Sequence, residues 1–391
     1  MINKACVQEE IASPIRIGFV LHVMQVAGAE VLVAETIRRL AGSIDPVVFC
    51  LDGVGQLGEQ MQQEGVPVVC FGRRAGFDMT VTSRLTSEIK KRDLEILHAH
   101  QYTPFFYTSL AKIMAAKPFH LIFTEHGRHF PDIVSVKRRL ANRWFLRRLA
   151  DEINAVCQFS VCSLIEKDGF VNKGIEIIEN GIDVDQYGPA ADRDALRTRL
   201  GLESGRKYLL CVARFHPVKD HETLIRAFAL VAREFANTDL LLAGDGILRD
   251  KLEHQVSQYD LNGRVRFLGV RRDVPDLLRA ADIFALTSLS EAASLTLMEA
   301  MATGLPVVVT DVGGNGEIVR NEFNGLMIPR GDSEAAARAF SRLLSQPDCA
   351  LRLGKLARES VLERYRLDRS VSRYYERYLA AARQLRENRA S

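Results

Sequence analysis

The sequence predicts an α/β protein that contains two doubly wound parallel sheets. Short apolar runs rich in β-branched residues alternate with longer segments of helical periodicity along the whole chain. Most of the short runs are continuously apolar, as expected for parallel strands that helices cover on both faces. The chain has 391 residues, which is more than one ordinary domain holds. We therefore expect two sheets of six or seven strands.

The predicted strands form two sets of similar size. In the first half we expect strands near residues 15–21, 47–51, 66–71, 96–100, 121–124, 153–156 and 176–178. In the second half we expect them near residues 208–212, 240–243, 265–268, 283–286, 307–309 and 326–328. The helical segments between successive strands imply right-handed crossovers, so each half is Rossmann-like.

The domain boundary is predicted at residues 183–193, where a Gly/Pro/Asp-rich stretch follows a strand. This gives an N-terminal domain over residues 1–185 and a C-terminal domain over residues 186–367. Residues 368–391 form a final helix with a broad apolar stripe at i, i+3, i+4 spacing. The stripe comprises Val371, Tyr374, Tyr375, Tyr378, Leu379, Ala382 and Leu385. We expect another part of the chain to cover it.

Composition excludes several classes of protein. The net charge of +3 over the whole chain is not that of a dedicated nucleic-acid binder. We find neither an apolar run long enough for a transmembrane helix nor an N-terminal secretion signal, which favours a cytoplasmic protein. The chain has seven cysteines without a C-x-x-C pair, for which we expect free thiols and no metal site. They are Cys6, Cys50, Cys70, Cys157, Cys162, Cys211 and Cys349.

Ligands of such sheets bind beyond the carboxyl ends of the strands, so the residues there are the candidates for a site. Gly28 follows the first predicted strand and opens a helix, where it either admits an anionic ligand or only makes a tight turn. His126 follows the fifth strand in TEHG. It either donates a hydrogen bond to a sugar hydroxyl or carbonyl, or is structural.

Two cations follow the first strand of the second half. Arg214 is predicted at the strand end and Lys219 at the start of the next helix, so both can point toward a diphosphate. The alternative is a pair of solvated surface charges. Gly246 in AGDG and Val270 after FLG also follow strands, and either approach a nucleoside or merely form turns.

The most informative segment contains two glutamates around the start of a helix. Glu291 precedes a helix predicted to begin near Ser294, and Glu299 lies just over one turn inside it. Two carboxylates suit the hydroxyls of a ribose and a hexose, and a diphosphate between them would meet the helix N-terminus. The alternative is two exposed helix glutamates. The backbone N–H groups between them belong to Ala292, Ala293, Ser294 and Leu295.

From Ile15 to about Tyr378 the chain resembles retaining glycosyltransferase family 4, which has the GT-B fold. The spacing Glu-x7-Glu followed by EAMATGLPVV carries this resemblance, together with VARFHPVKDHETLIRAF and AGDG. HAHQY, TEHG and IENGID add support from the first half. The resemblance implies two Rossmann-like domains that face each other across a cleft, with the final helix crossing back to the N-terminal domain.

The resemblance also implies roles for individual residues. Arg214 and Lys219 would bind the diphosphate of a nucleotide-sugar donor. Glu299 would hold the ribose hydroxyls, while Glu291 and His126 would contact the transferred sugar. The implied catalytic residues are therefore His126, Arg214, Lys219 and Glu291.

Other donor-binding roles follow by motif position. Gly28 would let its loop close over the phosphates, and Gly246 and Val270 would lie near the nucleoside. The sequence departs from the common family pattern at Ala27, at Ala292 and at residues 315–316, which bears on the preferred donor sugar. None of these departures removes a charged group.

The implied reaction is retaining hexosyl transfer from a UDP- or GDP-sugar to a hydroxyl on a sugar- or lipid-linked acceptor, in polysaccharide or glycolipid synthesis. No Asp-x-Asp motif is placed to hold a metal, so we expect no metal and no cofactor. The alternatives are a non-catalytic sugar-nucleotide-binding protein and a sugar-nucleotide epimerase, both of the GT-B fold. Acceptor choice is expected to depend on the loops at residues 72–80 and 128–135.

A basic segment suggests a further partner. Residues 136–149 read VKRRLANRWFLRRL from Val136 to Leu149, with six basic residues and no acidic one. Leu140, Trp144 and Phe145 interleave with the cations, as in helices that lie on anionic membranes. Such a helix would place the protein at the inner face of the cytoplasmic membrane. The alternative is a domain helix with a solvated basic face.

Overall fold

The computed structural model describes residues 13–127, 134–171 and 174–390. The chain forms two compact units, one made of Met1–Gly181 with Asp368–Ser391 and the other of Ile182–Leu367. Cys6 and most of the predicted acceptor loop at residues 128–135 lie outside the described residues.

The first unit contains a seven-stranded sheet in the order β3-β2-β1-β4-β5-β6-β7, with every neighbouring pair parallel. Its strands are β1 (Ile15–Val23), β2 (Ile44–Gly53), β3 (Val68–Cys70), β4 (Ile96–His100), β5 (His120–Glu125), β6 (Glu152–Ala155) and β7 (Ile175–Ile177). The chain starts in the middle of the sheet, proceeds to one edge and then returns to build the other half. The direction of winding therefore reverses between β1 and β4.

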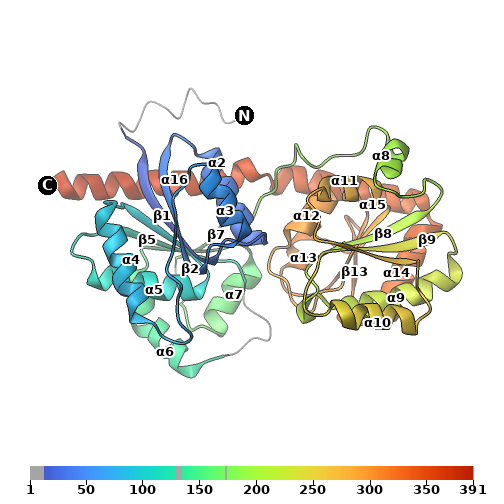
Figure 1. Ribbon diagram of the computed structural model, residues 1–391, viewed down its shortest axis with the longest axis horizontal. Helices are drawn as coiled ribbons and strands as arrows, with labels where there is room; N and C mark the ends of the chain where they lie inside the picture. Colours follow the sequence, from blue (N-terminus) through green and yellow to red (C-terminus); the bar gives the residue numbers. More distant parts are fainter. Residues whose placement is uncertain (1–12, 128–133, 172–173, 391) are drawn as a thin grey trace. The chain divides into compact units, whose positions relative to one another are not determined.

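Helices cover both faces of this sheet (Figure 1). They are α2 (Gly28–Arg39), α3 (Gly55–Gln63), α4 (Met79–Lys91), α5 (Tyr102–Met114), α6 (Val136–Trp144), α7 (Gln158–Glu166) and α16 (Leu367–Ala390), with a 3-10 turn at Leu146–Leu149. Apolar residues of α4, α5 and α7 pack with those of the strands in one buried cluster, where Phe105 stacks on Phe123 at a centroid distance of 4.4 Å.

The final helix, α16, packs on the first unit, as the fold class predicted. Four members of its predicted apolar stripe are buried: Val371, Tyr374, Tyr378 and Ala382. The Tyr378 hydroxyl lies 2.7 Å from Nδ1 of His98 in β4. Tyr375, Leu379 and Leu385 are only partly buried, so the covered stripe is narrower than predicted.

The second unit contains a six-stranded parallel sheet in the order β10-β9-β8-β11-β12-β13. Its strands are β8 (Lys207–Val212), β9 (Thr238–Ala243), β10 (Val265–Gly269), β11 (Ile283–Leu286), β12 (Val307–Thr310) and β13 (Leu326–Ile328). Its helices are α8 (Arg193–Arg199), α9 (His221–Glu234), α10 (Arg249–Gln258), α11 (Val274–Ala280), α12 (Leu295–Ala302), α13 (Asn315–Ile318), α14 (Ser333–Ser345) and α15 (Pro347–Arg364), with a 3-10 turn at Pro217–Lys219.

Helices lie on both faces of this second sheet (Figure 1), and two apolar clusters fill the space between the sheet and these helices. Helices α8, α11 and α12 contribute to one cluster, α9, α10 and α14 to the other, and α15 to both. The leucines of β9 alternate between the clusters, Leu241 in one and Leu240 and Leu242 in the other. This two-sided burial explains why the strand is continuously apolar in sequence.

The predicted fold class is confirmed in both units, with seven and six parallel strands close to the predicted positions. The six cysteines of the described residues are free thiols. Within the described ranges, no helix combines the length and apolar character needed to cross a membrane.

Candidate active site

The candidate site of the second unit lies where the strand order reverses. In this sheet β8 lies between β9 and β11, so the segments after β8 and β11 diverge to opposite faces of the sheet. Such a switch point leaves a crevice at the carboxyl ends of the strands. Arg214 and Lys219 follow β8, and Glu291 follows β11.

The structure brings Lys219 and Glu291 into direct contact. Lys219 Nζ donates to Glu291 Oε1 at 2.5 Å, and the Ser288 hydroxyl donates to the same oxygen at 2.6 Å. The side chains of Lys219 and Glu291 are 20% and 9% exposed, so the ion pair is largely shielded from solvent. Glu291 is therefore held as an oriented carboxylate.

The structure corrects the predicted position of Lys219 at the start of a helix, and the ion pair disfavours the alternative of a solvated surface charge for this residue. Lys219 does not begin a long helix, because Pro217–Lys219 forms a 3-10 turn and α9 starts at His221. Asp220 separates them with a φ of 45°, and its carboxylate accepts from Thr223 N to cap α9. The turn directs Lys219 toward the loop after β11, where Leu289 N donates to Val218 O at 2.7 Å.

A glycine loop after β12 holds the backbone of Glu291. Gly314 N donates to Glu291 O at 3.0 Å. Gly313 has a φ of +55°, and a Cβ at this position would lie 1.8 Å from Glu291 O. Only glycine permits so close an approach of the two backbones. The loop that contains Gly313 and Gly314 therefore supports the site.

Glu299 lies one turn inside α12, whose N-cap is Ser294, as predicted. The Ser294 hydroxyl accepts from Leu297 N at 3.4 Å. Burial raises the pKa of Glu299 to about 7, although a hydrogen bond from the Tyr187 hydroxyl opposes that rise. A hydrogen bond is stronger in a low-dielectric environment than in water. The buried carboxyl group of Glu299 can therefore bind the hydroxyl groups of a ligand strongly.

Ala292, Ala293 and Leu295 are partly buried between the two glutamates. Arg214 is exposed and forms no ion pair with a described residue, so its guanidinium is available to an anion. Val270 follows β10 and is 72% exposed.

The predicted glycine of AGDG is required by close backbone packing. Gly246 has a φ of +156°, and a Cβ there would lie 2.6 Å from Phe215 O. Phe215 N in turn donates to Asp245 O at 2.9 Å. The loop after β9 is therefore fixed against the segment that carries Arg214.

The first unit places its candidates at the equivalent switch point between β1 and β4. Gly28 is the first residue of α2, which follows β1, and Ala27 is its N-cap. His126 directly follows β5, and its Nε2 lies 2.8 Å from Nδ1 of His100, the last residue of β4. Burial lowers the pKa of His126 to about 4, so its imidazole is neutral near pH 7.

Sequence reasoning missed the histidines that support His126. His98 and His100 alternate on β4 in the HAHQY motif, and their rings lie 4.0 Å apart. Burial lowers the pKa of His98 to about 3 and moves that of His100 well below its ordinary value. The i, i+2 spacing of two histidines in an apolar strand was the available signal.

The other predicted acceptor loop, at residues 72–80, presents an aromatic side chain. Phe77 is 61% exposed, stacks on Tyr107 at 6.2 Å and meets Phe106 edge-on at 5.8 Å. The loop is anchored because Asp78 N donates to the Tyr107 hydroxyl at 2.9 Å. Phe77 gives this loop a fixed apolar surface.

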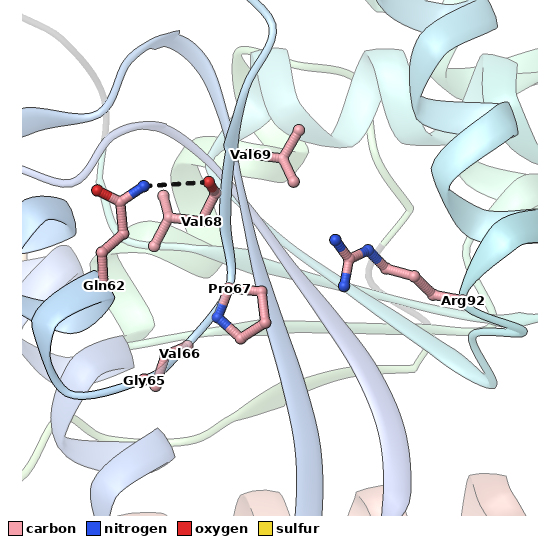
Figure 2. Close-up of a pocket in the computed structure, with 7 residues that line it drawn as sticks. All are labelled: Gln62, Gly65, Val66, Pro67, Val68, Val69 and Arg92. Carbon is pink, nitrogen blue, oxygen red and sulfur yellow. Dashed lines mark hydrogen bonds between the residues drawn. The ribbon is translucent and has the colours of Figure 1, made fainter.

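A hollow of about 360 Å³ lies beside the edge strand β3, and Figure 2 shows the residues that line it. It is lined by Gln62, Arg92 and residues 65–69, and Gln62 Nε2 donates to Val68 O at 3.4 Å. The lining residues precede or begin β3 and end α4, so the hollow opens at the amino end of the strands. It is therefore separate from the switch point of this sheet.

Two glycosyltransferase family models together match most of the chain. Residues 26–186 match the model of Glycosyltransferase Family 4, and residues 192–360 match the model of Glycosyl transferases group 1. The N-acetyl-alpha-D-glucosaminyl L-malate synthase of Bacillus anthracis is 30% identical over 76% of this chain and 78% of its own. A UDP-Gal:alpha-D-GlcNAc-diphosphoundecaprenol alpha-1,3-galactosyltransferase of Escherichia coli is 26% identical over 80% and 82%.

Solved structures share the fold. HepE of Anabaena in complex with UDP has a TM-score of 0.83 at 22% identity, covering 94% of this chain and 100% of that chain. A glycosyltransferase of Rickettsia africae has a TM-score of 0.81 at 19% identity, covering 94% and 98%. The two doubly wound units have the GT-B fold of these structures, and the matched family models and relatives define a glycosyltransferase. The chain belongs to glycosyltransferase family 4.

Proposed function

We propose that this glycosyltransferase moves a hexosyl group from a nucleotide-diphosphate sugar to a hydroxyl acceptor with retention and without a metal ion. The observation that carries the proposal is the Lys219–Glu291–Ser288 cluster beside Arg214 and the start of α12. Relatives support a UDP-sugar donor, since the Escherichia coli relative is named for UDP-Gal and HepE was solved with UDP. We propose that this transfer is a step in polysaccharide or glycolipid synthesis.

Different site residues would bind different parts of the donor. Arg214 and Lys219 would bind the diphosphate, with the N-terminal N–H groups of α12 adding positive potential. Glu299 would accept from the ribose hydroxyls. Glu291, fixed by Lys219 and Ser288, would contact a hydroxyl of the transferred sugar, as His126 would from the first unit.

The reaction requires stabilisation of the leaving group. The bond between the anomeric carbon and the diphosphate oxygen breaks, and the acceptor oxygen bonds to that carbon on the same face. The acceptor proton passes to the departing phosphate oxygen. Positive charge held at the developing diphosphate is often the largest catalytic contribution, and Lys219 would supply it here while remaining fixed by Glu291.

Lys219→Ala should lower kcat about 100-fold, by analogy with the loss of other preorganised charge-stabilising donors. Steady-state rates with a UDP-sugar would measure this. Lys251→Ala is the matched control, because Lys251 pairs with Glu222 at 2.8 Å on the same unit but outside the site. Near-wild-type turnover of the Lys219 variant would contradict the assignment.

The donor and the stereochemistry need separate experiments. Thermal shifts with UDP, GDP, ADP, dTDP and CMP, each in magnesium and in EDTA, should identify one nucleoside diphosphate that stabilises the protein in EDTA. Stabilisation only with magnesium would contradict metal independence.

Proton NMR of the product should show the donor's anomeric configuration retained. Donor binding without turnover would indicate a non-catalytic protein, and sugar-nucleotide conversion without acceptor would indicate an epimerase.

We also propose that α6 contacts an anionic membrane. This helix turns polar residues inward, since the Asn142 side chain donates to Asp168 O at 2.8 Å and Arg138 pairs with the Asp168 carboxylate at 2.8 Å. Its large apolar side chains instead point outward: Val136 is 68%, Leu140 56%, Trp144 63% and Phe145 52% exposed.

Exposed cations lie among these apolar side chains, at Lys137, Arg139, Arg143 and Arg148. This arrangement disfavours a merely solvated basic face and suits a surface of anionic lipid. A lipid-linked acceptor would fit, since the name of the Escherichia coli relative includes diphosphoundecaprenol. The free thiols of the described residues suit the cytoplasmic face of the membrane.

Vesicle binding tests this contact. Co-sedimentation with vesicles that contain phosphatidylglycerol should fall roughly tenfold for Leu140→Ser, because one leucine side chain loses its apolar burial. Leu351→Ser is the matched control, since Leu351 is also exposed, at 74%, but lies on the second unit. Equal binding to neutral and anionic vesicles, or equal loss in the control, would contradict the proposal.

A further inference from the structure

A cluster of polar side chains lies at the carboxyl ends of three neighbouring strands of the first sheet. His22 and Asp52 are the last but one residues of β1 and β2, and Arg73 follows β3. Arg73 donates to the Asp52 carboxylate from Nε at 2.7 Å and from Nη2 at 3.2 Å, and His22 Nδ1 lies 2.8 Å from Asp52 Oδ2. Ligands of such sheets bind beyond this edge. The donor-binding roles proposed above use none of these three side chains.

Asp52 is held as an oriented carboxylate at this edge. Partial burial opposes its ionisation, but the hydrogen bonds from Arg73 and His22 leave its pKa below the ordinary value. An ionised carboxylate only accepts hydrogen bonds, so His22 Nδ1 is the donor in their contact, and its two oxygens together accept about four such bonds. The Asp52 side chain is 31% exposed, so a hydroxyl group at the surface can donate a further one.

Arg73 connects this cluster to an exposed aromatic side chain. The guanidinium carbon of Arg73 lies 6.0 Å from the centre of the Tyr107 ring, and Phe77 stacks on the same ring at an interplanar angle of 19°. Phe77 is nevertheless 61% exposed. Its loop is held in place, because the Asp78 carboxylate accepts from Thr80 N at 3.0 Å and Asp78 N donates to the Tyr107 hydroxyl. Much of a fixed aromatic ring is therefore open to a ligand.

A fixed aromatic ring beside planar charged groups suits a sugar ring. One face of a pyranose presents C–H groups, whose partial positive charge packs against the negative face of an aromatic ring. The hydroxyl groups around the pyranose form hydrogen bonds with carboxylate and guanidinium groups. A lipid chain would instead bring Asp52 and Arg73 against an apolar phase, which is costly. An acyclic anion would need an unbalanced cation, and the charge of Arg73 is balanced by Asp52.

We infer that Phe77 and the Asp52–Arg73 pair form a subsite for a neutral pyranose ring of the acceptor. Phe77 would stack on the ring, and Asp52, oriented by Arg73 and His22, would accept from one of its hydroxyl groups. The inference rests on the proposed transfer to a hydroxyl acceptor. It names the class of that acceptor as a saccharide, and it involves only residues of the first unit.

Binding can be measured without catalysis. Saturation-transfer difference NMR on the full-length protein, with and without UDP, would use the methyl α-glycosides of glucose, galactose, mannose and N-acetylglucosamine as probes. We expect at least one glycoside to receive saturation at its ring C–H protons when aromatic protons of the protein are irradiated. Absence of saturation transfer to all four would overturn the inference.

Substitutions at Phe77 separate stacking from general apolar contact. Because Phe77 is exposed, its replacement should change the Tm little. Phe77→Leu keeps an apolar side chain but should weaken glycoside binding about three- to tenfold, as expected for the loss of one aromatic contact. Phe77→Trp should bind at least as well as the wild type. Equal affinities of the wild type and Phe77→Leu would contradict stacking and with it the subsite.

Asp52→Asn tests the hydroxyl contact. It keeps the shape of the side chain but removes the charge that strengthens a hydrogen bond, so glycoside binding should fall roughly tenfold, and unchanged affinity would refute the subsite. Phe323→Leu is the matched control, because Phe323 is also exposed, at 42%, but lies on the second unit. It should bind the glycoside as the wild type does, and a loss equal to that of Phe77→Leu would also refute the subsite.

Other occupants of this surface would give different results. Malate, an acyclic dianion, should receive no saturation, whereas saturation that is lost in Arg74→Ala would indicate an anion site at this exposed residue instead. Phe77→Leu should bind phosphatidylglycerol vesicles as the wild type does, and a loss would indicate contact with the membrane. Either of these opposite results would overturn the inference. A missing thermal shift with every nucleoside diphosphate would contradict the proposed donor site but not the glycoside result, so the two failures are distinguishable.

Discussion

At the scale of single residues, the two glutamates of the candidate site have different electrostatic environments. Lys219 and Glu291 form an ion pair at 2.5 Å, whereas Glu299 pairs with no cation among the described residues and accepts a hydrogen bond from the Tyr187 hydroxyl. Burial of a carboxyl group without a cation raises its pKa. The two glutamates of the Glu-x7-Glu motif therefore differ in environment, which suits different ligand groups.

Glu299 should make stability depend on pH. Its pKa is about 7 in the folded protein against an ordinary 4.5, so between these values the folded state keeps a proton that the unfolded state has released. The associated stability is present below pH 4.5 and is lost as pH rises to 7. The Tm of Glu299→Gln relative to wild type should therefore rise by a few degrees between pH 4.5 and 8. A pH-independent difference in differential scanning fluorimetry would contradict this environment.

At the scale of elements, α16 is attached to the first unit by an ion pair between the buried carboxylate of Glu95 and the partly exposed Arg386. Arg386 donates to the fully buried Glu95 from Nε at 2.6 Å and from Nη2 at 3.1 Å. Burial opposes ionisation of Glu95, but the bonds from Arg386 and from Arg16 N leave its pKa below the ordinary value. Helix α16 therefore contributes charge compensation as well as apolar cover.

Arg386→Ala should destabilise the protein by about 1–3 kcal/mol near pH 7, because the buried carboxylate of Glu95 loses its two hydrogen bonds from Arg386 and keeps, as its contact with a cation among the described residues, only the longer one with Arg16 Nη2 at 3.6 Å. The deficit should shrink as pH falls through the depressed pKa of Glu95, since the wild type then loses the same interaction. Urea unfolding at pH 7 and pH 4 would measure both effects. Gln384→Ala, an exposed change on the same helix, is the control and should have no effect at either pH.

At the scale of the whole molecule, the four charged residues that are proposed to bind the donor belong to one compact unit. Arg214, Lys219, Glu291 and Glu299 lie within Ile182–Leu367, which has its own sheet and two apolar clusters. We expect a fragment of residues 182–367 to fold cooperatively and to be stabilised by the same nucleoside diphosphate as the full chain. Calorimetry of the fragment would test this, and failure to bind in a folded fragment would contradict a donor site within the unit.

Much of the fold was predictable because its signals are local. Continuous apolar runs and helical periodicity located the strands of both sheets, and Ser294 was recognised as a helix start. The segments that carry Arg214, Lys219 and Glu291 could be placed at strand ends for the same reason. The prediction that a helix starts at Lys219 was wrong. The left-handed conformation of Asp220 separates the 3-10 turn that contains Lys219 from the helix that follows.

The sequence by itself determined the fold class, the family resemblance and the positions of the candidate residues, because these depend on periodicity and on spacing within short segments. Only the tertiary structure decided the pairing of Lys219 with Glu291 across 72 residues and of His100 with His126 across 26. It also decided that α6 turns its apolar side chains outward. Contacts between distant segments, and the face that a helix buries, depend on what packs beside it, and local sequence does not contain that information.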